Sequence, residues 1–178
     1  MKKTLLVGAV LVCVVVFAGV ASAANHIGVG YYFQGDHRGL TLKGELALTD
    51  MIDVGLDYFG IEGGSWTDIY ASMNLKEFGD TLVGAYGGAR LHTSSLTKPE
   101  LLLGVWAEQP LSSQFLLYGD AGVAIGLGSG HVGSTSFEAV AGLMADVYAP
   151  FWLAGEAILK SGNSGGPIGF RVLVGMDF

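Results

Sequence analysis

The chain has 178 residues, the length of one domain, with a mean hydropathy of +0.50 and only 14% charged residues. Its formal net charge of −7 argues against nucleic acid as a partner, because binding to a phosphate backbone requires a cationic surface. So few charges, together with 29 glycines, would be unusual in a soluble globular domain.

Residues 1–23 have the pattern of a secretory signal peptide. Two lysines precede an apolar run over residues 5–20, and the small residues Ala-Ser-Ala follow, ending at Ala23. We therefore expect cleavage after Ala23, which leaves residues 24–178 as the mature domain. A transmembrane anchor is the alternative, but the apolar run is short and the small residues form a good cleavage site.

Removal of this segment also removes Cys13, the only cysteine, so the mature domain has neither disulfide nor thiol chemistry. Two of the 9 basic residues are lost with it, so 7 remain against 16 acidic residues, a formal charge of −9. No set of Cys and His residues has the spacing of a metal site, and we expect no cofactor and no metal.

From His26 onward, apolar residues recur at every second position in segments separated by clusters of Gly, Asp, Ser and Pro. A period of two predicts β-strands with one apolar face. The first four apolar faces are Ile27, Val29, Tyr31 and Phe33; Leu40, Leu42, Leu46 and Leu48; Ile52, Val54, Leu56 and Tyr58; and Ile69, Ala71, Met73 and Leu75. The next five are Val83, Ala85, Ala89 and Leu91; Leu101, Leu103, Val105 and Ala107; Phe115, Leu117, Ala121, Val123 and Ile125; Phe137, Ala139, Ala141, Leu143, Ala145 and Val147; and Phe151, Leu153, Ala157 and Leu159.

With a last strand at the C-terminus, these segments make ten strands, and no segment has a convincing helical period. No apolar run after Ala24 approaches the roughly 18 residues of a membrane helix. A soluble sandwich is the alternative, but the polar faces are rich in Gly, Tyr and isolated acids, and nothing covers the apolar faces. A sheet in lipid must close on itself. We therefore predict an all-β, transmembrane, antiparallel up-and-down β-barrel of ten strands, with eight strands as the alternative.

The last segment, IGFRVLVGMDF, places apolar residues at alternate positions and ends on an aromatic residue. With the signal peptide and the alternating strands, residues 25–178 resemble a small Gram-negative-type outer-membrane β-barrel protein in architecture. The resemblance implies a location in the cell outer membrane, with outer-membrane lipid and the barrel-assembly machinery as partners. In that family the final strand resembles the signal that this machinery reads, and the matching positions here are Phe170, Val172, Val174, Met176 and Phe178.

The alternate, polar positions of the predicted strands face the interior and hold ten acids and four bases, a formal lumenal charge of −6. These residues are Lys43, Glu45, Asp53, Asp57, Asp68, Arg90, Glu108, Asp120, Glu138, Asp146, Glu156, Lys160, Arg171 and Asp177. One interpretation is a narrow, cation-preferring path for small solutes or ions. The alternative is a closed lumen packed with salt bridges and tyrosines, in a structural or interaction barrel, because eight strands already leave an interior that side chains can fill.

Enzymatic alternatives rest on few residues, and we expect no catalytic site. Arg90, His92 and Ser94 alternate at a strand end, and a His-x-Ser pair resembles outer-membrane lipid A deacylases, in which serine attacks a lipid ester. No orienting acid is evident near this pair in the sequence. His37 beside Asp36 imitates the groups of outer-membrane proteases, but the loops are too short for a peptide cleft. The glycines of residues 126–130 precede a strand rather than the helix that a phosphate loop requires.

Overall fold

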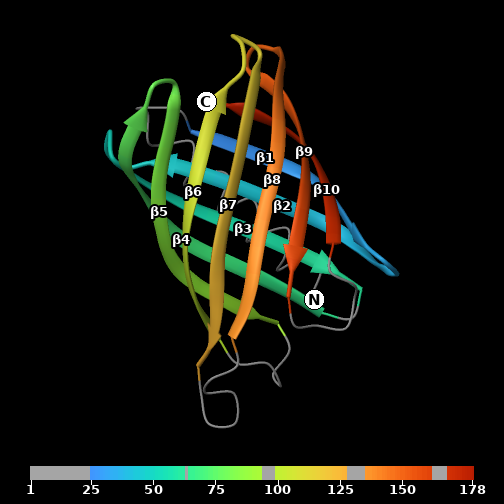
Figure 1. Ribbon diagram of the computed structural model, residues 1–178. Helices are drawn as coiled ribbons and strands as arrows, with labels where there is room; N and C mark the ends of the chain where they lie inside the picture. The colour runs from blue at the N-terminus through green and yellow to red at the C-terminus, as the bar shows by residue number, and fades with distance from the viewer. Residues whose placement is uncertain (1–24, 63, 94–98, 128–134, 162–167) are drawn as a thin grey trace.

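The computed structural model describes residues 25–62, 64–93, 99–127, 135–161 and 168–178. Ten antiparallel strands form one closed barrel in which each strand pairs with its neighbours in sequence and β1 pairs with β10 (Figure 1). The strands are β1 His26–Gln34, β2 His37–Ala47, β3 Ile52–Ile61, β4 Gly64–Phe78, β5 Thr81–His92, β6 Glu100–Pro110, β7 Phe115–Gly126, β8 Thr135–Tyr148, β9 Phe151–Lys160 and β10 Ile168–Asp177. The prediction of a ten-stranded, up-and-down barrel is confirmed, whereas the predicted signal peptide lies outside the described residues.

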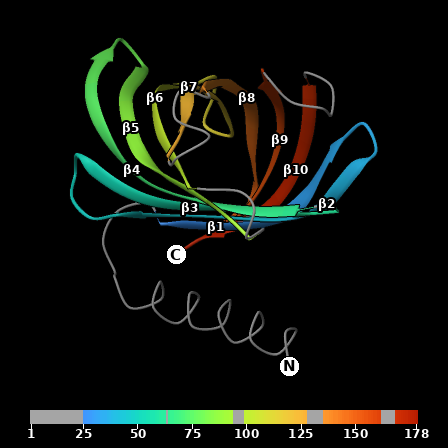
Figure 2. The same cartoon turned by 90° about the horizontal axis from the view of Figure 1, so that it is seen from below.

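Closure depends on the pairing of the first strand with the last. Their register runs from His26 opposite Asp177 to Phe33 opposite Phe170. The backbone groups at the edges of β1 and β10 are therefore paired, which removes the open edge that a flat sheet would present. Figure 2 shows the closed wall, with β1 to β3 along one side and β4 to β10 arching over it.

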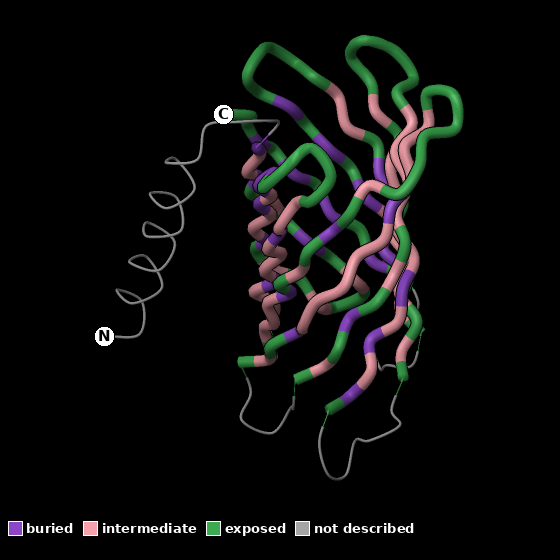
Figure 3. The backbone as a smooth tube through the Cα atoms, turned by 90° about the vertical axis from the view of Figure 1, so that its left-hand side faces the viewer, coloured by how far each residue is buried: buried purple, intermediate pink, exposed green. Residues whose placement is uncertain are grey.

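The two faces of the wall differ as the period of two predicts. On β10 the outward residues Phe170, Val172 and Val174 are 47 to 54% exposed, whereas the inward Arg171 and Leu173 are 2% and 1% exposed. Figure 3 shows this alternation around the barrel. All the predicted apolar faces point outward. Leu46 is the exception in burial, since it lies in the outward phase but is only 7% exposed.

The pairing of neighbouring strands is regular except at two places. The register shifts by one residue between Asn74 and Lys76 on β4, and again between Asp146 and Tyr148 on β8. Both irregularities lie close to the short turns that join β4 to β5 and β8 to β9. The described part of the chain contains no helix that is long and apolar enough to cross a membrane.

Candidate functional site

The lumen contains a cavity of about 520 Å³ lined by inward side chains from around the wall. It brings together thirteen of the fourteen charged residues predicted to face the lumen. The fourteenth, Glu156, has no exposed side-chain surface because ion pairs cover it. The structure thus places these predicted residues in the lumen, while their role in conduction stays a prediction.

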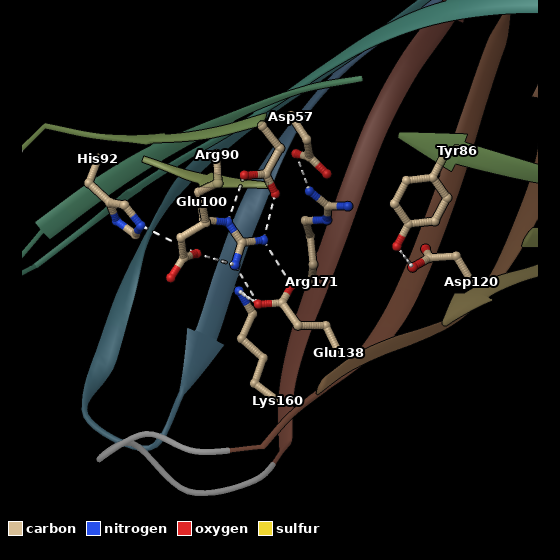
Figure 4. Close-up of polar contacts among 10 residues, drawn as sticks. Asp57, Tyr86, Arg90, His92, Glu100, Asp120, Glu138, Lys160 and Arg171 are labelled. Atoms are coloured by element: carbon tan, nitrogen blue, oxygen red, sulfur yellow. Dashed lines mark hydrogen bonds and ion pairs between the residues drawn. The ribbon is translucent and has the colours of Figure 1, made fainter. Parts of the chain in front are cut away.

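One set of charges lies where the strands approach the longer loops, and we call Asp68, Arg90, Glu100, Glu138 and Lys160 the outer belt (Figure 4). Arg90 donates to both carboxylate oxygens of Asp68 at 2.7 Å and from Nη2 to Glu138 Oε2 at 2.8 Å. Lys160 Nζ lies 3.4 Å from Glu138, and Glu100 lies 3.6 Å from Arg90. The bidentate arginine geometry makes this a firmly held network.

A second set lies nearer the middle of the barrel, and we call Lys43, Asp57, Glu156 and Arg171 the middle belt. Arg171 donates from Nε to Glu156 at 2.6 Å and from Nη1 to Asp57 at 2.5 Å. Lys43 Nζ lies 3.5 Å from Glu156, which also accepts a hydrogen bond from the Tyr118 hydroxyl at 2.7 Å. Two bases and two acids make this belt neutral.

Aromatic rings connect the two belts. Phe59 and Trp66 stack with centroids 4.7 Å apart, and the Lys160 ammonium lies 4.2 Å from the Trp66 centroid. The Arg171 guanidinium lies 4.7 Å from the centroid of Phe59. Cations over ring faces are stabilised by the ring quadrupole, so these rings support both belts. Phe59 and Trp66 were not among the predicted lumenal residues, although they fall on the inward phase of their strands.

The remaining lumenal acids form a third region, and we call Glu45, Asp53, Glu108, Asp120, Asp146 and Asp177 the acidic vestibule. Five of them lie near the short turns, and Asp120 lies further along β7. Among the described residues, no lysine or arginine forms an ion pair with any of the six. Glu45 lies 3.6 Å from His26, and Asp120 accepts a hydrogen bond of 3.4 Å from Tyr86.

The charge of the lumen is thus unevenly distributed. The two belts hold four bases and five acids, a formal charge of −1, whereas the vestibule contributes −6. Glu100 was not among the predicted lumenal residues. It is the first residue of β6 and shares the inward phase of Trp106 and Glu108, which is the signal that could have found it.

Four rings of the cavity lining lie across glycines of the wall, and we call Tyr70, Tyr86, Trp106 and Tyr118 the aromatic wall. A Cβ built at Gly104 would lie 2.4 Å from Tyr86 Cζ, and one at Gly84 would lie 2.3 Å from Trp106 Cε2. Gly55 and Gly142 have the same relation to Tyr70 and Tyr118. Because each ring lies over a glycine, it is flush with the wall and turns one face toward the lumen.

The groups considered for catalysis are placed as follows. His92 points inward and its Nε2 lies 3.5 Å from Glu100, an acid that the sequence did not connect with it, while Ser94 lies outside the described residues. Asp36 and His37 belong to the β1–β2 hairpin, where Asp36 is exposed. The glycine-rich segment after Gly126 also lies outside the described residues. In the described ranges, no group of three or more His, Cys, Asp or Glu residues could hold a metal ion.

No family model matches the chain, and no curated protein matches it. Solved structures do. A KdgM porin has a TM-score of 0.55 at 10% identity, with 86% of this chain and 99% of the porin covered. The KdgM porin in complex with disordered oligogalacturonate has a TM-score of 0.52 at 9% identity, with 87% of this chain and 98% of the porin covered. The translocator domain of the autotransporter NalP from Neisseria meningitidis has a TM-score of 0.52 at 14% identity, over 98% and 95%.

The chain has the fold of outer-membrane β-barrels. At identities of 9 to 14% the likeness shows the architecture and leaves the lumen of each protein to be interpreted from its own side chains.

Proposed function

We propose that the chain is a non-enzymatic, integral outer-membrane barrel whose lumen is a narrow path that prefers small cations. The observation that carries this proposal is the acidic vestibule, whose six carboxylates form no ion pair with a lysine or arginine of the described residues and line the 520 Å³ cavity. A ring of acids at the mouth of a narrow lumen concentrates cations and repels anions. The nearly neutral belts beyond it would act as the barrier that a cation must pass.

The acidic side chains of the lumen argue against an anionic solute of the kind that is bound to one structural neighbour. That porin was solved in complex with oligogalacturonate, a polymer of acidic sugars. A polyanion would meet six acidic side chains, a formal charge of −6, in this vestibule, and repulsion in a confined, poorly screened space is strong. We therefore propose small cations and small cationic solutes, and no acidic oligosaccharide.

A closed-lumen structural or interaction barrel is the second candidate, and the belts favour it. Arg171 on β10 binds Asp57 on β3, and Arg90 on β5 binds Glu138 on β8, so ion pairs join strands that are not neighbours. Such pairs cross the lumen and fill part of it. Ten strands also lie near the barrel size at which side chains fill the interior.

We further propose export by the general secretion route with removal of residues 1–23, and insertion by the barrel-assembly machinery. Phe170, Val172, Val174 and Met176 form one outward row on β10, and Phe178 follows it. An outward apolar row is the surface that lipid and an assembling partner strand would meet. Substituting Phe178 by alanine should lower the yield of inserted barrel more than the stability of barrel that has already formed.

Planar-bilayer recording of the purified barrel in a KCl gradient tests the proposed function. We expect discrete conductance steps and a reversal potential whose sign shows that K⁺ passes more readily than Cl⁻. Well-inserted protein without conductance would favour the closed barrel instead. The lipid-modifying alternative has a separate test, in which Ser94→Ala is compared with the wild type for lipid A acyl content. We expect no difference, and a changed acyl pattern would contradict the non-enzymatic assignment.

A further inference from the structure

The lumen already contains two sites that hold an ammonium group between a carboxylate and an aromatic ring. Lys43 Nζ lies 3.5 Å from Glu156 Oε1 and 5.2 Å from the centroid of Tyr118. Lys160 Nζ lies 3.4 Å from Glu138 Oε1 and 4.2 Å from the centroid of Trp66. In both sites the cation receives a charge-assisted contact and a ring face, the combination that stabilises alkylammonium groups.

The vestibule repeats the carboxylates and rings, but there no lysine or arginine of the described residues forms an ion pair with the acids. Asp120 accepts a hydrogen bond from Tyr86 (Figure 4). It also pairs directly across the strands with Trp106. Glu108 pairs across the strands with Tyr118 and lies two residues from Trp106 on the same face. Direct cross-strand partners have Cβ atoms about 5 Å apart, so each of these carboxylates lies beside at least one ring.

The orientation of the rings makes their faces available to a ligand. The Tyr86 ring lies over Gly104 with its hydroxyl near Gly122, and the Trp106 ring lies over Gly84, so one face of each ring is against the wall. The other face is directed toward the cavity, which Tyr86, Trp106, Glu108 and Asp120 all line. An aromatic ring attracts a cation through its face and not through its edge, and flush rings therefore offer the attractive side.

We propose that the vestibule binds small aliphatic amines that carry more than one ammonium group, such as diamines and polyamines, between these carboxylates and rings. This inference rests on the proposed function and names the solute class of the same path. Several acids on different strands match several ammonium groups joined by a flexible apolar chain. Ring faces bind alkylammonium groups favourably, because these groups are more easily desolvated than small metal ions. The volume of about 520 Å³ lies in the range of small-molecule sites.

The test is a calorimetric titration of 1,4-diaminobutane into folded, detergent-solubilised barrel, with butan-1-ol and KCl as comparison solutes. We expect saturable binding of the diamine, none of the alcohol, and weak competition by KCl at matched ionic strength. Asp120→Asn, Glu108→Gln and Trp106→Leu should each weaken binding roughly tenfold, the loss expected for one charge or cation–π contact. Folding of each variant is checked on a detergent gel, where a closed barrel should migrate faster unheated than boiled. Only variants that show this difference are titrated, so misfolding cannot imitate lost binding.

Glu62→Gln is the matched control, because Glu62 is an exposed acid outside the cavity and the substitution changes the net charge equally. We expect its affinity for the diamine to equal that of the wild type. Absence of saturable binding, binding unchanged in Asp120→Asn and Glu108→Gln, or equal competition by K⁺ would each overturn the inference. Calorimetry does not require conduction. A barrel that binds the diamine without conducting ions contradicts only the proposed channel. A barrel that conducts ions without binding the diamine contradicts only the proposed amine site.

Discussion

Asp53 and Asp57 lie on the same strand and the same inward face, yet they belong to two different regions of the lumen. Asp57 accepts a hydrogen bond of 2.5 Å from Arg171 and is part of the neutral middle belt. Asp53 lies in the vestibule with no basic partner among the described residues, although it lines the same cavity. The difference shows that a position in the lumen does not by itself determine what an acidic side chain does. Whether a basic partner reaches it from across the barrel determines this.

Energetics explain why the two regions should respond differently to substitution. A buried ion pair offers little net stability compared with apolar packing, but removing one partner leaves an uncompensated charge and costs about 3–5 kcal/mol. An acid that faces a hydrated cavity without a partner has no such pair to lose. The belts should therefore control stability, and the vestibule should control which ions enter.

The largest effect is expected from Arg171→Met, which removes the cation that holds both Asp57 and Glu156. Lys43 alone would then face two acids. We expect the free energy of unfolding to fall by about 4 kcal/mol, measured by urea unfolding in lipid vesicles with tryptophan fluorescence. Arg38→Met is the control, since Arg38 is exposed, and it should have little effect. Equal losses in the two variants would contradict the role of the belt.

A smaller effect is expected from Gly104→Ala, which tests whether the rings must lie flush with the wall. The new methyl group would lie 2.4 Å from Tyr86 Cζ, so the ring must move toward the lumen. We expect a loss of about 1–3 kcal/mol from overpacking and a smaller unitary conductance. Gly155→Ala adds the same methyl group where no atom lies within 4 Å. If it lowered conductance equally, the flush arrangement would not matter.

The smallest effect on stability is expected from Asp53→Asn, which removes a vestibule charge that no base accompanies. Its free energy of unfolding should stay within about 0.5 kcal/mol of the wild type, while Asp57→Asn should lose about 3 kcal/mol. Parallel urea unfolding of the two variants provides the comparison. Similar stabilities would show that the two regions are not energetically distinct.

The strands and their faces were predictable because the period of two is a local property of the sequence. Every predicted apolar face points outward, and every predicted lumenal charge points inward. The pairing of the charges was not predictable in the same way. Arg171 and Asp57 are separated by 114 residues, and their contact depends on closure of the barrel, which brings β3 and β10 to face each other.

The aromatic residues show an intermediate case. Tyr70, Trp106 and Tyr118 fall on the inward phase of their strands, as the alternating pattern alone would place them. Their relation to Gly55, Gly84 and Gly142 on neighbouring strands depends on register. Register is set by turns and by pairing around the whole barrel, and an alternating pattern does not contain it. Glu100 was missed for a simpler reason, because it begins its strand and lies just outside the apolar run.

Comparing the reversal potentials of the wild type and of Asp53→Asn in a KCl gradient tests whether the vestibule sets ion selectivity. We expect a cation-selective potential for the wild type and a shift toward zero for Asp53→Asn, at an unchanged folded fraction. Identical potentials for the two proteins, or an anion-selective wild type, would contradict the assignment of selectivity to the vestibule.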